Sequence, residues 1–315
     1  MPELPEVETV VRALRARGLV GRLIRRTIVR WPAMVSPLSP AAFAARLNGR
    51  RVESIRRRAK YILLGLSGGE VLLVHLRMTG RLELAAAHTP ASIHHHVRLL
   101  LDGGRELRFH DTRKFGRWRL TRRPDAVLAR LGPEPLDAAL TAPALCARLR
   151  AHRRILKPLL LDQTFLAGLG NIYADEALWL ARLNPCRASD SLRTDEARRL
   201  LQAIRDVLRQ GIRRGGSTLG PGLPHFESPG GQRGSNQAAL QVFRRTGAPC
   251  PRCGSPVRRA MIAQRATHYC ARCQPPPRSG HVPALPGHRG RVWLDSRTRR
   301  RRGRGLTGRR AGRLF

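Results

Sequence analysis

Four cysteines near the C-terminal end constrain the fold more than any other feature of this 315-residue sequence. They form two C-x-x-C pairs, Cys250 with Cys253 and Cys270 with Cys273, separated by sixteen residues. Thiolates at this spacing bind a structural zinc ion tetrahedrally and leave no coordination position open for catalysis. The spacing therefore predicts one Zn²⁺ on paired β-hairpins, with an iron centre or redox thiols as the alternatives.

The charge of the chain points to a polyanionic partner. The formal net charge is +39 and the isoelectric point is near 11.9, an excess too large for an ordinary solvated surface, so nucleic acid is the simplest partner. The sequence has no apolar run of membrane-spanning length, and its acidic start lacks the features of a signal peptide. We therefore expect a cytoplasmic protein with no membrane partner.

Lysine is rare among the basic residues. Of 60 lysines and arginines, only Lys60, Lys114 and Lys157 are lysines. A lysine can lose its proton or act as a compact point charge, and arginine does neither. Each lysine is therefore a candidate site residue, with chance survival in an arginine-biased composition as the alternative.

Residues 22–120 alternate short apolar runs with glycine-rich turns, the pattern of antiparallel β-strands. A first helix is expected to end near Gly18, before these strands. Strands this closely spaced favour an antiparallel sandwich or barrel. The expected strands are 22–29, 51–57, 61–66, 71–76, 97–101, 106–109 and 117–120.

The apolar period becomes helical after a proline-marked stretch at 132–135, which we interpret as a linker. Helices are expected around 145–156, over 172–183 and over 194–214, followed by a mobile, glycine-rich loop to 245. The tail is too rich in proline, glycine and arginine to bury a core and is predicted to be disordered.

The sequence thus predicts an α+β multidomain protein. Its expected parts are an N-terminal helix with an antiparallel β-sandwich at 1–132, a helical domain at 133–245, a zinc finger at 246–273 and a basic tail at 274–315.

The first six residues, Met-Pro-Glu-Leu-Pro-Glu, carry an unusual candidate nucleophile. Removal of Met1 would leave Pro2 as a free secondary amine, and an α-amino group is unprotonated near neutral pH far more often than a lysine. Glu3 lies beside it and can transfer protons. The alternative is an ordinary helix start, because proline and glutamate suit a first helical turn and Val7 and Val10 follow at helical spacing.

Three motifs in this order resemble those of the bacterial formamidopyrimidine-DNA glycosylase family. They are MPELPEVET at 1–9, Asp162-Gln163 followed by GLGNIYADE at 168–176, and the four-cysteine finger. The resemblance covers residues 1 to about 273 and implies that the helical domain is a helix-two-turns-helix domain. It implies a monomeric enzyme that excises oxidised purines, chiefly 8-oxoguanine and formamidopyrimidines, from damaged double-stranded DNA and cuts the abasic strand by β,δ-elimination.

The resemblance also implies catalytic roles. Pro2 would attack the sugar C1′ and form a Schiff base, and Glu3 would transfer the protons of the ring oxygen and of the elimination. Lys60, at the tip of an expected hairpin, would contact a DNA phosphate near the lesion, although the bare sequence also allows an ordinary exposed charge. Lys157 and Glu6 would support the active site or shuttle protons.

Further residues match positions at which the family contacts DNA. Met78 and Phe115 would wedge into the base stack that a flipped base leaves, and Arg113 would pair with the orphaned cytosine. Composition alone favours core positions for the first two and a surface charge for Arg113. Asn171 would grip the backbone beside the lesion, with the finger residue Arg265 on the same side.

Two weaker positions and a loop complete the set. Tyr173 and His94 are expected to contact DNA. The run His94-His95-His96 could suggest a metal site, but neighbouring strand residues alternate faces, so a hydrated turn is favoured. Ser217 and Thr218 match the lesion-capping loop, whose backbone amides contact the flipped base. Residues 220–237 depart from the family, because the aromatic residues that it usually has around 233–236 are absent.

Two other functions remain open. A glycosylase of the same fold would prefer oxidised pyrimidines, whereas the start of the chain and the Met78, Arg113, Phe115 set favour the purine enzyme. A non-catalytic zinc-ribbon nucleic-acid-binding protein would explain the charge and the cysteines, but not Pro2 and Glu3.

Overall fold

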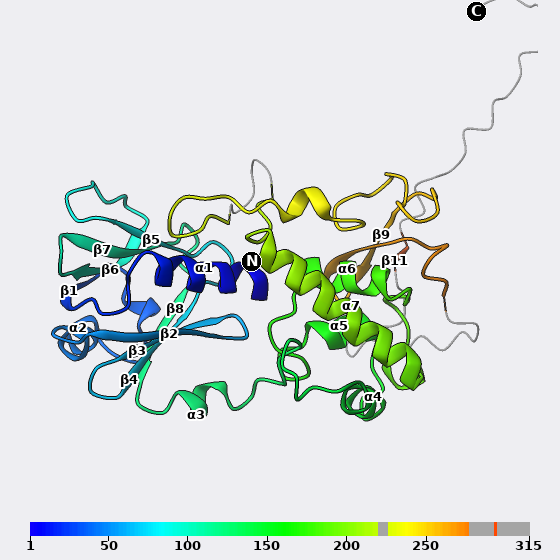
Figure 1. The fold of residues 1–315 in the computed structure, drawn as a ribbon, viewed down its shortest axis with the longest axis horizontal. Coiled ribbons are helices and arrows are strands. Elements are labelled where there is room, and N and C mark those ends of the chain that lie inside the picture. Colours follow the sequence, from blue (N-terminus) through cyan, green and yellow to red (C-terminus); the bar gives the residue numbers. More distant parts are fainter. Residues whose placement is uncertain (220–225, 277–292, 295–315) are drawn as a thin grey trace, which may run out of the picture.

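The computed structural model describes residues 1–219, 226–276 and 293–294 of the chain. Its described part consists of a β-sandwich and a helical body side by side, with the N-terminus at the junction between them (Figure 1). A small sheet that includes the finger hairpin packs against the helical body. The expected fold class, a sandwich with a helical domain and a zinc finger, is confirmed.

Helix α1 (Leu4–Ala16) connects the two bodies. The Glu6 carboxylate accepts a hydrogen bond of 2.9 Å from the Glu3 amide, so this start does form the helix entry that its residues indicate. Leu4 is buried in the core of the helical body, whereas Val7 and Val10 are buried in the sandwich core. The helix therefore fixes the N-terminus where the two cores meet.

The sandwich consists of two antiparallel four-stranded sheets. All seven expected strands are present, with small shifts at their ends. One sheet has the order β1 (Ile24–Val29), β6 (His95–Leu101), β7 (Arg105–His110) and β5 (Arg81–Ala86). The other has the order β2 (Val52–Arg58), β3 (Tyr61–Leu66), β4 (Glu70–His75) and β8 (Arg117–Thr121).

Several elements were not expected. Strand β5 carries only two leucines before a run of alanines, a composition with weak strand propensity. Helix α2 (Pro40–Leu47) is capped by the Ser39 side chain and buries Phe43 and Leu47. The others are α3 (Pro124–Leu128) and short 3₁₀ helices at Pro32–Met34, Ser189–Ser191 and Asn236–Ala239.

The helical body contains four helices where three were expected, because the expected helix around 145–156 is divided in two. Leucines and isoleucines at helical spacing on the longest of them, including Leu200, Ile204 and Leu208, are buried in its core. The helices are α4 (Ala142–Arg150), α5 (Leu156–Leu161), α6 (Asn171–Leu180) and α7 (Thr194–Arg213).

The stretch interpreted as a linker is fixed to the sandwich. The Glu134 carboxylate accepts hydrogen bonds from Arg57 at 2.7 and 2.9 Å and from the Ala59 amide at 2.5 Å. Side-chain bonds between residues about 75 positions apart leave no local signal in the sequence. The connection between the two bodies is therefore held in place rather than loose.

The finger contains the expected hairpin of β9 (Arg258–Ile262) and β10 (Arg265–Tyr269). Strand β11 (Trp293–Leu294) adds to β9 and falls within the tail predicted to be disordered. Residues 277–292 and 295–315 lie outside the described residues, so that prediction remains untested for most of the tail.

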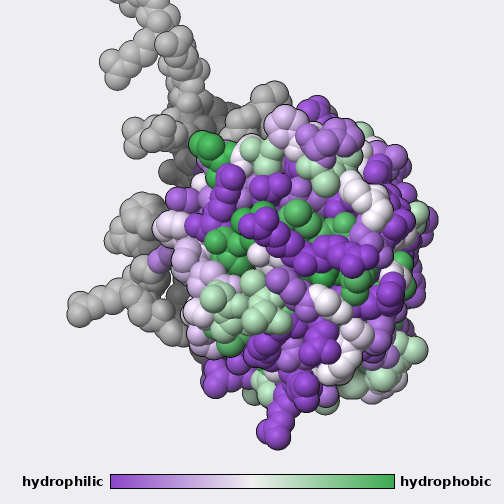
Figure 2. Space-filling model, turned by 90° about the vertical axis from the view of Figure 1, so that its left-hand side faces the viewer, coloured by the Kyte–Doolittle hydropathy of each residue, from purple (hydrophilic) through white to green (hydrophobic). Residues whose placement is uncertain are grey.

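The surface matches the high charge of the chain. Seen from the sandwich end, it is dominated by hydrophilic side chains with apolar patches between them (Figure 2). No helix in the described ranges is long and apolar enough to cross a membrane.

Candidate active site

The Glu3 carboxylate lies at the N-terminus of α6. Its Oε1 accepts a hydrogen bond of 2.9 Å from the Ile172 amide, and its Oε2 accepts one of 3.4 Å from the Tyr173 amide. Burial raises the pKa of Glu3, an effect that Lys60 and the two amides oppose. Glu3 is therefore a buried carboxyl of α1 held by a helix of the other body.

Gly170, the residue in front of α6, makes room for this carboxylate. A Cβ at Gly170 would lie 2.2 Å from Glu3 Cδ and 2.5 Å from its Oε1. The φ of Gly170 is −132°, a backbone value that any residue adopts. The close approach of Glu3, and not the backbone conformation, therefore requires glycine here.

A second buried carboxylate, that of Glu6, connects three segments. Besides the Glu3 amide, it accepts hydrogen bonds of 2.8 Å from the Tyr173 hydroxyl and 2.8 Å from the Ser217 amide. Burial, reinforced by the nearby Glu3, raises the pKa of Glu6 to about 7. Glu6 thus supports the site by joining α1, α6 and the segment after α7.

The Tyr173 side chain faces the interior of the protein. Its ring is buried and its hydroxyl donates to Glu6. A Cβ at Gly211 on α7 would lie 2.6 Å from this ring, so glycine there lets the ring pack against the helix. The sequence does not show that the Tyr173 side chain faces the interior, and the DNA contact of this residue stays a prediction.

Pro2 lines a hollow with an empty volume of about 470 Å³, part of it open to solvent. In the structure Pro2 follows Met1, and burial lowers the pKa of the Met1 amine. The walls come from the start of α1, the turn before β5, α6 and the segment after α7; they include Glu6, Met78, Thr79, Arg81, Ile172, Ser217, Phe226 and Glu227.

Lys60 lies in the turn between β2 and β3, as predicted, but it is buried. Its Nζ donates a hydrogen bond of 2.9 Å to the Leu169 carbonyl. Burial lowers the pKa of Lys60, while Glu3 and Glu6 raise it. The alternative of an ordinary exposed hairpin charge is wrong, and the phosphate contact of Lys60 stays a prediction.

Lys157 holds the finger hairpin against the helical body. Its Nζ lies 2.6 Å from Asp175 Oδ1 and donates hydrogen bonds of 3.0 Å to the Ala266 carbonyl and 2.8 Å to the Thr267 hydroxyl. The side chains of Lys157 and Asp175 are both fully buried. These contacts hold the Lys157 ammonium within the protein, and its role as a support of the site or as a proton shuttle stays a prediction.

Asn171 and Arg265 meet the same hairpin. The Asn171 side chain donates a hydrogen bond of 3.0 Å to the Ala266 carbonyl, next to Arg265, which begins β10 and is exposed. Asn171 Oδ1 is buried without a partner among the described residues. The structure thus brings Asn171 and Arg265 together, while their phosphate contacts stay predictions.

Replacing Lys157 with methionine is expected to lower the free energy of unfolding by about 3–5 kcal/mol, because Asp175 is left as a buried, unpaired charge. Urea denaturation measures the loss. Adding Asp175→Asn should restore part of it, and Lys114→Met, which removes an exposed lysine, serves as the control. Equal losses for the two lysine variants would contradict the assignment of a buried pair.

Met78, Arg113 and Phe115 come together at the surface of the sandwich. Arg113 Nη1 lies 3.2 Å from Met78 Sδ, and the guanidinium carbon lies 4.7 Å from the centre of the Phe115 ring. Met78 is 36% and Phe115 45% exposed, so their alternative interpretation as core residues is wrong. Exposed apolar side chains beside an arginine suit insertion into a base stack.

Buried Asp111 shapes the loop that carries two of these residues. Its Oδ1 accepts hydrogen bonds from the Thr79 hydroxyl and, at 3.2 Å, from the Arg113 amide. Its Oδ2 accepts one of 2.7 Å from the Gly116 amide. Asp111 therefore fixes the loop between β7 and β8 against the turn that carries Met78.

The histidine run does not form a hydrated turn. His95 and His96 begin β6 and are buried, with His95 Nε2 2.9 Å from Glu83 Oε2 and His96 Nε2 3.0 Å from the Asp111 carbonyl. These partners come from other segments of the chain, so the sequence alone did not indicate them. His94 is half-buried beside the Asp111 loop, and its DNA contact stays a prediction.

Ser217 and Thr218 are buried, and their amides are already occupied. The Ser217 amide donates to Glu6, and the Thr218 amide donates a hydrogen bond of 2.9 Å to Gln237 Oε1. Both amides are thus bound within the protein in this arrangement, and their contact with a flipped base stays a prediction. Residues 220–225, part of the departing stretch, lie outside the described residues.

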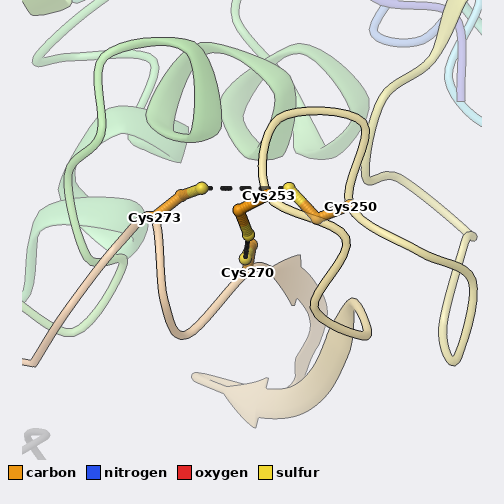
Figure 3. A group of neighbouring side chains, drawn as sticks. All are labelled: Cys250, Cys253, Cys270 and Cys273. Carbon is orange, nitrogen blue, oxygen red and sulfur yellow. Dashed lines mark hydrogen bonds between the residues drawn. The ribbon is translucent and has the colours of Figure 1, made fainter.

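The four finger cysteines converge from two turns (Figure 3). Their sulfur atoms all lie within 4.8 Å of one another, with 3.9 Å between Cys250 and Cys273 and 3.4 Å between Cys253 and Cys270. A tetrahedron with Zn–S bonds of about 2.3 Å has sulfurs about 3.8 Å apart. The cluster therefore fits one structural Zn²⁺, which completes the finger and leaves no open ligand position.

Known protein families match this chain along most of its length. The formamidopyrimidine-DNA glycosylase N-terminal domain matches residues 1–118, the H2TH domain of the same enzyme matches 131–221, and the zinc finger found in FPG and IleRS matches 247–276. A formamidopyrimidine-DNA glycosylase of Herpetosiphon aurantiacus is 49% identical over 277 residues, which is 87% of this chain and 100% of that protein. The chain belongs to the formamidopyrimidine-DNA glycosylase family.

Solved structures of the family have the same fold. The MutM (Fpg) protein of Thermus thermophilus is 44% identical with a TM-score of 0.78, and the match covers 87% of this chain and 98% of that one. The Lactococcus lactis Fpg in complex with DNA containing N7-benzyl-Fapy-dG is 35% identical with a TM-score of 0.79, over 87% and 100% of the two chains.

Three residues of this family member were not singled out from the sequence. Gly170 precedes a helix, where glycine is often only a cap, and Asp111 follows a strand like many loop residues. Asp175 gave a usable signal, because an acidic residue in the middle of the apolar helix α6 indicates a buried partner.

Proposed function

We propose that this member of the formamidopyrimidine-DNA glycosylase family excises oxidised purines and cleaves the resulting abasic strand through Pro2 and Glu3. The observation that carries the proposal is the placement of Pro2 in the wall of a hollow, with the buried Glu3 carboxyl directly behind it at the N-terminus of α6. A nucleophilic amine and a proton-transfer group are thus adjacent.

The proposed reaction starts with removal of Met1. In the Met1–Pro2 peptide the Pro2 nitrogen is an amide, whose lone pair is delocalised, whereas the free secondary amine is a nucleophile. Its lone pair attacks C1′ of the damaged nucleotide, the bond from C1′ to the base breaks, and the base leaves with the electron pair. Burial lowers the pKa of the Met1 amine, and the same surroundings favour an unprotonated Pro2.

Glu3 is proposed to transfer the protons of the later steps. Protonation of the ring oxygen opens the sugar and leaves an iminium ion between Pro2 and C1′. The iminium makes the C2′ proton acidic, so a carboxylate can remove it, and elimination expels first the 3′ and then the 5′ phosphate. The raised pKa of Glu3 matches this task, because the carboxyl must gain and lose protons near neutral pH.

Damaged duplex DNA is the partner that fits the exposed side chains of this surface. Met78, Arg113 and Phe115 are proposed to fill the space that the flipped nucleotide leaves, and Asn171 and Arg265 to hold phosphates beside it. A monomer that acts in the cytoplasm completes the proposal, because chromosomal DNA carries the substrate.

The test is a duplex with one 8-oxoguanine opposite cytosine. The expected products are the free base and a one-nucleotide gap with phosphates at both ends. Binding without either product would support the zinc-ribbon alternative, and faster release of an oxidised pyrimidine would support the pyrimidine enzyme.

Replacing Gly170 with alanine is expected to lower the excision rate about 10²-fold, because the added methyl group displaces the Glu3 carboxyl. Single-turnover kinetics measure the change. In a protein that already carries Glu3→Gln, the same substitution should lower the excision rate little further, since both changes act on the function of the Glu3 carboxyl. Independent, additive losses would contradict the claim that Gly170 acts through Glu3.

A further inference from the structure

One wall of the hollow carries an arginine–carboxylate pair contributed by two separate segments. Arg81 begins β5, and its Nη1 donates a hydrogen bond of 3.1 Å to Glu227 Oε2. Both residues line the hollow together with Pro2 and Glu6. A hydrogen-bond donor and an acceptor thus stand side by side in the hollow that contains the proposed nucleophile.

The backbone holds the two members of this pair in register. Strand β5 is at the edge of its sheet, and the segment that carries Glu227 packs along that edge. The Leu84 amide donates a hydrogen bond of 3.3 Å to the Pro229 carbonyl, and Glu227 forms an isolated bridge with Arg233. An edge strand has unpaired backbone groups, and here one of them fixes the position of the neighbouring segment.

Glu83 is the other carboxylate beside Arg81. Its Oε1 lies 2.8 Å from Arg81 Nε, and its Oε2 lies 2.9 Å from His95 Nε2. His95 Nδ1 accepts a hydrogen bond of 2.9 Å from the Ser92 amide, so Nε2 carries the proton and donates to Glu83. Glu83 therefore lies beside the Arg81 guanidinium and is bound to His95, whereas the hydrogen bond of Arg81 to a carboxylate goes to Glu227.

The pair itself has unused capacity. Glu227 Oε1 lies 3.5 Å from Nε of Arg233, whose side chain is 67% exposed, so this contact is loose. Within residues 1–219 and 226–276, no hydrogen bond engages Arg81 Nη2. One donor of Arg81 and one acceptor of Glu227 can therefore serve a bound base.

We propose that Arg81 and Glu227 select the damaged purine by its N7 edge, an inference that rests on the function proposed above. Undamaged guanine presents two acceptors there, O6 and N7. Oxidation at C8 places a hydrogen on N7, and the ring-opened formamidopyrimidine retains a carbonyl oxygen beside an N–H. Both damaged bases thus present an acceptor next to a donor, the complement of Arg81 next to Glu227.

The same pair disfavours the normal purines. Guanine would direct the N7 lone pair at the Glu227 carboxylate, and adenine would direct its amino group at the Arg81 guanidinium. A site built to hydrogen-bond one pattern rejects a base that leaves its polar groups unpaired or opposed. Arg81 and Glu227 are therefore specificity-determining residues for the base and take no part in the chemistry at the sugar.

The test compares Arg81→Gln and Glu227→Gln with the wild-type protein on two duplexes, one carrying 8-oxoguanine opposite cytosine and one a preformed abasic site. The measured quantity is the ratio of the single-turnover excision rate to the abasic cleavage rate. We expect this ratio to fall about 10- to 100-fold in each variant, because the abasic duplex has no base to contact. Excision of dihydrouracil, a ring-saturated pyrimidine without an N7 edge, should fall less.

Asp195→Asn and Arg199→Gln are the matched controls, because they break an exposed pair with a separation of 2.8 Å on α7, and the ratio should stay at the wild-type value. An unchanged ratio in Glu227→Gln, or an equal loss on dihydrouracil, would overturn the inference. If Arg81→Gln impairs folding, the rate ratio of Glu227→Gln alone tests the inference, since glutamine has nearly the same size as glutamate. A wild-type protein that cleaves neither duplex would instead overturn the proposed function and this inference with it.

Discussion

Replacing Glu3 with glutamine is expected to lower the single-turnover rate of 8-oxoguanine excision by about 10²- to 10⁴-fold. Glutamine has nearly the same shape, and its carbonyl oxygen can still accept the hydrogen bond from the Ile172 amide. It cannot, however, gain and lose a proton as the carboxyl does. The loss therefore reports proton transfer, with the fold of the site retained.

The control for Glu3 is a glutamate on the same helix that lies outside the hollow. Glu8 pairs with Arg12 and Arg57, each at 2.9 Å, and Glu8→Gln is expected to keep the excision rate within about threefold. If Glu3→Gln were no slower than Glu8→Gln, Glu3 could not be the proton-transfer group.

Replacing Cys270 with serine is expected to release the zinc ion and to weaken binding of an abasic-site duplex about 10- to 100-fold. Cys270 is fully buried, and four thiolates are needed to close the tetrahedral site. Without the ion, the β9–β10 hairpin loses the structure that positions Arg265 beside Asn171. Zinc content and fluorescence anisotropy of labelled DNA measure the two effects.

A cysteine outside the cluster provides the control for this change. Cys186 does not belong to the group of four neighbouring cysteines, and burial raises the pKa of its thiol to about 11. Cys186→Ser should retain one zinc per chain and wild-type affinity for the duplex. Retention of both properties by Cys270→Ser would show that the finger does not depend on the four-cysteine cluster.

The parts of the fold that were predictable are those with local signals. Apolar runs between glycine turns located seven strands of the sandwich, and helical periodicity located the helices of the second body. Strand β5 was missed because its stability comes from pairing with β7 and not from its alanine-rich sequence. The firm attachment of Glu134 was missed because its partners lie about 75 residues away.

The residues of the candidate site also fall into two groups, those with a local signal in the sequence and those without one. The initial motif and the cysteine spacing indicated Pro2, Glu3 and the zinc ligands, because the chemistry follows from residue type and position. The burial of Lys60 and the inward orientation of Tyr173 depend on contacts between α1, β3 and α6, for which the sequence has no short-range pattern. The hydrogen bond from the Ser217 amide to Glu6 was likewise not predicted, because the two residues are 211 positions apart.

The measurement that tests the central claim most directly is borohydride trapping on a duplex with one 8-oxoguanine opposite cytosine, followed by mass mapping of the adduct. Reduction converts the transient iminium into a stable bond, so the attacking amine stays marked. We expect one adduct, on an N-terminal peptide that begins at Pro2 and lacks Met1. An adduct on Lys60 or Lys157, or excision without any adduct, would contradict Pro2 as the nucleophile.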